Sequence, residues 1–152
     1  MIAERRVEDR SLVFASLHYA LALIGAGRSD IARQLTAGLG AGSSNGEQGA
    51  LAREIGARAA AALTAFGEAR YAEAAQSLLS VRRKLRWIGG SNAQRDLFEQ
   101  ILIEACVRAG MTQQARTLLS ERLGARGANR FATDRHEQIA RGSYCGADKI
   151  SS

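Results

Sequence analysis

The chain has 152 residues, 46% of them apolar, no proline and a formal net charge of +6 at pH 7. This length suits a single domain, and the apolar content excludes a compositionally disordered chain. Aromatic and β-branched residues are sparse, which disfavours a sheet, and the longest apolar run, residues 19–27, is too short to cross a bilayer. We therefore expect an all-α chain with no membrane partner.

Helical periodicity begins near residue 12. The apolar stripe recurs at three- and four-residue steps and consists of Val13, Leu17, Ala20 and Ile24. Gly25 and Gly27 weaken this helix, and a second apolar set over residues 31–35 ends at the glycine-rich segment 38–49. The pattern predicts a helix, a tight turn and a second helix.

The same unit recurs twice along the chain. Apolar periodicity predicts helices over residues 47–66, 71–87 and 92–109, and a turn at Gly110 that leads to a last helix ending near residue 123. The sequence therefore predicts about three helical hairpins.

The turns of these hairpins align with one another. Gly27, Ala69 and Gly110 each precede an alanine by five residues, at Ala32, Ala74 and Ala115. The steps are 42 and 41 residues, longer than the roughly 34 residues of a tetratricopeptide repeat. The small-x-(Tyr)-x-x-Ala pattern, with its aromatic kept only at Tyr71, nevertheless predicts tetratricopeptide-like hairpins in an α-α superhelix over residues 1–123.

The segment 124–152 differs from the repeats, because it is rich in glycine, arginine and serine and has weak periodicity. We expect it to be a poorly ordered tail or to contain one short helix, from about Thr133 to Arg141, with Thr133 as its cap.

The residues that most often carry chemistry are scattered. Cys106 lies in an apolar helical run and is expected to be a buried small hydrophobe, and Cys145 lies far from it. No metal spacing and no Ser/His/Asp or Cys/His set can be argued, so the sequence predicts no cofactor and leans away from an enzyme. Two cysteines without a leader indicate a reducing, cytoplasmic location.

The least generic stretch joins the second and third hairpins. Gly89 or Gly90 suits the left-handed residue that ends a helix, and Ser91 with Gln94 forms a predicted capping box. Trp87, the single tryptophan, is expected to close the gap between these hairpins.

A family resemblance rests on three runs. They read Gly-Gly-Ser-x-Ala-Gln-Arg-Asp-x-Phe-Glu-Gln at 89–100, Leu-Ile-Glu-Ala at 102–105 and Ala-Arg-x-Leu-Leu-x-Glu-Arg-Leu at 115–123. Over residues 87–123 the chain resembles the tetratricopeptide repeat protein 38 family. The resemblance implies a superhelical repeat fold with no established catalytic mechanism, and a chain corresponding to the C-terminal part of longer members or to a shortened relative. One departure is Asn92, where the family often has histidine.

Two polar groups near this junction are candidate sites. The first turn of the third hairpin carries Asn92, Gln94, Arg95 and Asp96. These residues, with Trp87, could bind a partner carboxylate or another anion at free backbone N–H groups. Alternatively, they are caps together with a local Arg–Asp pair.

A basic cluster precedes that turn. Its four members, with no acid between them, are Arg82, Arg83, Lys84 and Arg86. This cluster suits phosphate or an acidic peptide, or it complements the dipole at a helix C-terminus. The segment disfavours nucleic acid as a partner, because binding it calls for several stacking aromatic side chains and Trp87 is the one nearby.

The favoured function is a protein–protein interaction module that holds a partner peptide or helix on the concave surface of the repeats. The alternatives are a ligand-binding or catalytic helical-repeat protein with an anion site at Ser91–Asp96, and a basic module that binds nucleic acid. Because no polar capping helix is evident after the third hairpin, the sequence also predicts self-association.

Overall fold

The computed structural model describes residues 2–40, 47–127 and 129–141, and all regular structure in these ranges is helical. The α-helices are α1 (Ile2–Gly25), α2 (Ser29–Ala37), α3 (Glu47–Gly67), α4 (Tyr71–Val81), α5 (Asn92–Arg108), α6 (Thr112–Arg126) and α7 (Arg130–Ala140). Two 3₁₀ helices are η1 (Gly38–Gly40) and η2 (Arg82–Ile88). The all-α prediction is confirmed. Within the described ranges, each helix is too short or too polar to cross a membrane.

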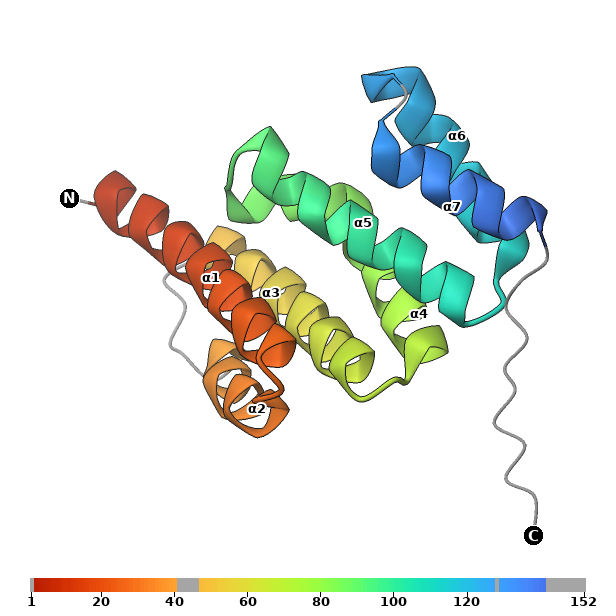
Figure 1. Cartoon of the computed structure of the whole chain (residues 1–152). Coiled ribbons are helices and arrows are strands. Elements are labelled where there is room, and N and C mark those ends of the chain that lie inside the picture. The colour runs from red at the N-terminus through yellow and green to blue at the C-terminus, as the bar shows by residue number, and fades with distance from the viewer. Residues whose placement is uncertain (1, 41–46, 128, 142–152) are drawn as a thin grey trace, which may run out of the picture.

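The helices form a row that runs from α1 and α2 at one end to α6 and α7 at the other (Figure 1). Sequence neighbours pack together, as α1 with α2, α3 with α4, and α5 with α6. Helix α3 lies beside α1, whereas α5 packs on α4 and η2 and makes only sparse contacts with α3. The second and third pairs are therefore joined differently from the first and second.

The turns inside the three helix pairs have one common geometry. Gly27, Ala69 and Gly110 have positive φ angles of 74°, 59° and 71°. The residue after each donates its N–H to the carbonyl five positions earlier, as Arg28 to Leu23, Arg70 to Ala65 and Met111 to Cys106, each at 2.8 Å. This is the bond that closes a Schellman-type helix end. The alignment of these three positions from sequence is thus matched by backbone geometry.

The alanines that follow these turns are fully buried. Ala32, Ala74 and Ala115 have no exposed surface, and each donates its backbone N–H to a carbonyl four residues earlier at 3.0 Å. Because an alanine side chain is a single methyl group, the second helix of each pair can lie close against the first. The described residues therefore contain three helical hairpins built on one local design.

Ala69 offers a direct test of the shared turn geometry. A left-handed conformation costs a residue with a Cβ roughly 1–2 kcal/mol, whereas glycine adopts it freely but loses more entropy on folding. The other two turns have glycine at this position. We expect Ala69→Gly to raise the free energy of unfolding by about 0.5–1 kcal/mol. Urea denaturation followed by circular dichroism measures this change, and a destabilised variant would contradict it.

The junction between the second and third hairpins is filled by apolar side chains other than the predicted one. Trp87 is 47% exposed, so the expectation that it closes this gap was wrong. Leu85 and Ile88 are buried instead, and the rings of Phe14 in α1 and Phe98 in α5 lie 6.0 Å apart. Contact between α1 and α5 therefore supplies part of the packing between hairpins.

Cys106 is fully buried in the described core, as predicted. Burial raises the pKa of its thiol to about 11, so the side chain stays neutral at physiological pH and acts as an apolar filler.

Beyond the third hairpin, helix α7 packs on α6. The predicted cap Thr133 was wrong, because the side chain of Asn129 accepts the N–H of Ala132 at 2.9 Å and the helix begins at Arg130. The guanidinium groups of Arg122 and Arg135 lie 5.5 and 5.6 Å from the centroid of the Phe131 ring. The structure thus has a helix close to the short one expected at 133–141, and this helix packs on α6, where no polar capping helix was evident from sequence; self-association stays a prediction. Cys145 and residues 142–152 lie outside the described residues.

Candidate functional site

The basic cluster lies on a 3₁₀ helix. Helix α4 ends at Val81, so the predicted α-helix over 71–87 was wrong from residue 82 onward, where η2 begins. A 3₁₀ helix has about three residues per turn, so every third side chain lies on the same line. Leu85 and Ile88 share the inward line with Arg82, and they are buried. The remaining side chains of η2, at Arg83, Lys84, Arg86 and Trp87, are exposed.

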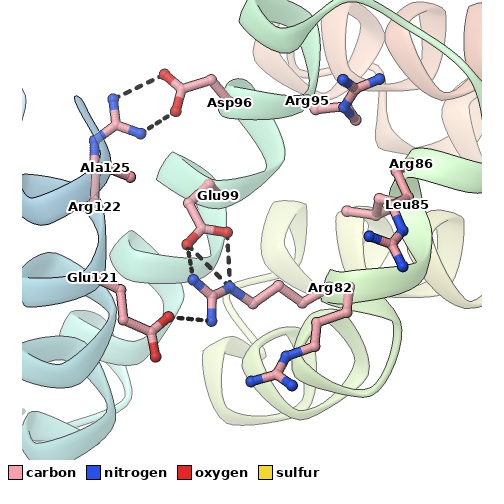
Figure 2. Close-up of a pocket in the computed structure, with 10 residues that line it drawn as sticks. Arg82, Leu85, Arg86, Arg95, Asp96, Glu99, Glu121, Arg122 and Ala125 are labelled. Carbon is pink, nitrogen blue, oxygen red and sulfur yellow. Dashed lines mark hydrogen bonds and ion pairs between the residues drawn. The ribbon is translucent and has the colours of Figure 1, made fainter.

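Arg82 is held by acids from two other helices. Its Nε donates to both carboxylate oxygens of Glu99 in α5, at 3.0 and 2.9 Å, and its Nη1 lies 2.6 Å from Oε2 of Glu121 in α6. Figure 2 shows the guanidinium reaching between the two carboxylates. Hydrogen bonds to Glu99 and then to Glu121 raise the pKa of Arg82. Arg82 is therefore a charged bridge between η2, α5 and α6.

Asp96 forms a second bridge, from α5 to α6. Its carboxylate accepts two hydrogen bonds from Arg122, one of them at 2.8 Å from Nη2, and a third from Gln100 at 2.9 Å. The side chains of Arg122 and Asp96 are only 3% and 12% exposed. The hydrogen bond to Asp96 raises the pKa of Arg122. The predicted local pair between Arg95 and Asp96 was therefore wrong.

The first turn of α5 is capped as predicted. The Ser91 hydroxyl accepts the N–H of Gln94 at 3.2 Å, and the Gln94 side chain accepts the N–H of Ser91 at 2.9 Å. Arg95 donates to the carbonyls of Gly89 and Gly90 and to the side chain of Asn92. Two of the N–H groups that an anion would need are thus already engaged.

These elements enclose a groove of about 380 Å³ between η2, α5 and α6 (Figure 2). We call it the basic groove, and its lining residues are Arg82, Arg83, Leu85, Arg86, Arg95, Asp96, Glu99, Glu121, Arg122 and Ala125. Among the described side chains that line the groove, five are arginines and three are carboxylates, which leaves an excess of two positive charges. Among the described residues, Arg83 and Arg86 form no ion pair with a carboxylate, and Arg86 stacks over the Trp87 ring at 5.9 Å.

The structure thus divides the nine residues proposed from sequence into two groups. Arg82, Gln94, Arg95 and Asp96 are engaged in contacts within the chain, and Asn92 accepts from Arg95. The other four, Arg83, Lys84, Arg86 and Trp87, are exposed and form no hydrogen bond or ion pair with another described side chain, whereas Asn92 and Gln94 are exposed but engaged. Three charged groove residues were missed: Glu99, Glu121 and Arg122. They lie 17 or more residues from their partners, so no local pattern could have found them.

The arrangement suits binding through charge. Within the described ranges, no three His, Cys, Asp or Glu side chains are grouped closely enough to hold a metal ion. Exposed guanidinium groups can bind carboxylates or phosphates with two parallel hydrogen bonds. The basic groove therefore offers an anion two exposed cationic side chains, beside an arginine and carboxylates that are already paired with one another.

No protein-family model matches this sequence, and no solved structure matches the chain significantly.

Proposed function

We propose that this chain is a protein–protein interaction module of tetratricopeptide-repeat type that binds an acidic segment of a partner protein in the basic groove. The observation that carries the proposal is the charge excess of this groove, where Arg83 and Arg86 lack carboxylate partners among the described residues. The ion pairs of Arg82 with Glu99 and of Arg122 with Asp96 join the three walls, η2 to α5 and α5 to α6. A partner segment with several carboxylates complements this charge.

The repeat type is proposed from the hairpins themselves. The three turns share positive φ, the same closing hydrogen bond and a buried alanine at the start of the second helix. These features suit a tetratricopeptide-like design, although the repeats are longer than usual. The relationship to the tetratricopeptide repeat protein 38 family is likewise a proposal, and its support is the sequence of residues 87–123.

The proposed location differs from the first expectation, which was a concave surface along the first helices. Helices α3 and α5 make sparse contacts, so the first helices of the second and third hairpins do not form a continuous packed surface. The basic groove instead lies between η2, α5 and α6. We therefore place the partner segment there.

The two alternatives receive less support. At Ser91–Asp96, the N–H groups of Ser91 and Gln94 already have partners, which weakens an anion site on the helix start. For nucleic acid, the basic groove has no aromatic lining residue on which bases would stack. A groove with excess positive charge but no aromatic surface for bases favours an acidic peptide over nucleic acid.

The test uses a fluorescein-labelled octapeptide of alternating aspartate and glutamate, titrated with the whole chain at about 50 mM salt. We expect Arg83→Gln/Arg86→Gln to weaken binding by about tenfold, because two cationic contacts are lost. The matched control is Arg33→Gln/Arg58→Gln, which removes the same charge from exposed positions on α2 and α3.

Two outcomes would contradict the proposal. One is equal weakening by both double variants, which would indicate a response to net charge alone. The other is tighter binding of an oligothymidylate of the same charge than of the octapeptide, which would favour the nucleic-acid alternative.

A further inference from the structure

The two acids that hold Arg82 differ in how firmly they are bound. Glu99 accepts hydrogen bonds from Nε at 3.0 and 2.9 Å, as well as one from Nη2, and its side chain is 21% exposed. Glu121 contacts only Nη1, at 2.6 Å, and its side chain is 48% exposed. An exposed single-contact ion pair contributes little to stability, so the contact between Arg82 and Glu121 is the one that exchanges readily with solvent.

Glu121 also lies where an acidic ligand would lie. Its carboxylate extends from α6 into the basic groove and meets the guanidinium of Arg82 there (Figure 2). Arg83 and Arg86 line the same groove without carboxylate partners among the described residues. The groove therefore presents the guanidinium groups of Arg83 and Arg86 to a ligand. One edge of the Arg82 guanidinium is already occupied by Glu121.

We propose that Glu121 is an internal competitor for the acidic partner, displaced from Arg82 when a partner carboxylate enters the basic groove. This inference rests on the proposed function. A ligand with one carboxylate gains little binding free energy by displacing Glu121 from Arg82, because one ion pair with Arg82 replaces another. A segment with several carboxylates gains the contacts to Arg83 and Arg86 as well, so Glu121 makes the groove selective for multiply acidic segments.

The test compares Glu121→Gln with the wild-type chain, using the same labelled octapeptide. We expect the variant to bind about fivefold more tightly, because the outer edge of Arg82 no longer has an acid of its own. A labelled peptide with a single carboxylate should gain proportionally more, because it cannot displace Glu121 from the wild-type chain. Unfolding in urea should be nearly unchanged, since Glu121 is half exposed.

Glu73→Gln is the matched control. Glu73 is 57% exposed and pairs with Arg70 at the start of α4, away from the groove lining, and its removal changes the net charge equally. Equal tightening by both variants, or no tightening by Glu121→Gln when the wild type binds, would overturn the competitor role alone. Failure of the wild type and of both variants to bind the octapeptide would overturn the proposed function, and the competitor role with it.

Discussion

Replacing Asp96 with alanine is expected to lower the free energy of unfolding by about 3 kcal/mol, because it leaves a buried arginine without its carboxylate. The side chain of Arg122 is 3% exposed, and Asp96 accepts two of its hydrogen bonds. A charge this deep cannot recover its hydration without opening the contact between α5 and α6. Urea denaturation of the variant and the wild type measures the loss.

A second variant separates the ion pair from general damage to the helix. In Asp96→Ala/Arg122→Met both charges are absent, so the double variant should be more stable than Asp96→Ala alone. The control is Asp134→Ala, which breaks an exposed ion pair on α7 in which the side chains of Arg130 and Asp134 are 95% and 62% exposed. It should change the free energy of unfolding by less than about 0.5 kcal/mol. A loss below about 1 kcal/mol in Asp96→Ala would contradict the buried-charge argument.

Gly90→Ala is expected to destabilise the chain by about 3 kcal/mol, for two independent reasons. Gly90 has a φ angle of 83°, which a residue with a Cβ adopts only under strain. A Cβ at this position would also overlap the ring of Phe14, which belongs to α1. The turn before α5 therefore touches α1, the first helix of the chain. Equilibrium unfolding in urea measures the combined cost of the backbone strain and of the overlap with Phe14.

Gly89 provides the control for this substitution. Its φ and ψ angles are 94° and −155°, a region essentially limited to glycine, but a Cβ there would meet open space, so Gly89→Ala should cost only the backbone strain, about 1–3 kcal/mol. Phe14→Leu should destabilise the wild type yet restore part of the loss in Gly90→Ala, because the shorter side chain relieves the overlap. Equal losses in the two alanine variants would show that the contact with Phe14 is unimportant.

The features that could be predicted from sequence are those set by neighbours in the chain. Ser91 and Gln94 form a capping box because their reciprocal bonds span three residues. The turn at Gly110 follows from a small residue placed at the end of an apolar helix. Burial of Ala74 follows from its position five residues after Ala69, the residue with positive φ.

The features that could not be predicted depend on the type of helix or on partners far apart in the sequence. An α-helical period groups Arg82 with Arg86, whereas the 3₁₀ period of η2 groups Arg82 with Leu85 and turns it inward. The partner of Asp96 is Arg122, 26 residues away on another helix, whereas the sequence pattern indicates its neighbour Arg95. The candidate site is therefore predictable as a basic segment, but its ion-paired frame requires the tertiary structure.

The common turn geometry also constrains how such a chain can lengthen. Gly27, Ala69 and Gly110 recur at steps of 42 and 41 residues, and each is followed by the same closing bond. An insertion of one whole step would add another hairpin whose turn is in phase with the turns of its neighbours. An insertion of half a step would instead present a first helix where a second helix is required. A chain of this architecture can therefore gain or lose whole hairpins, but not single helices.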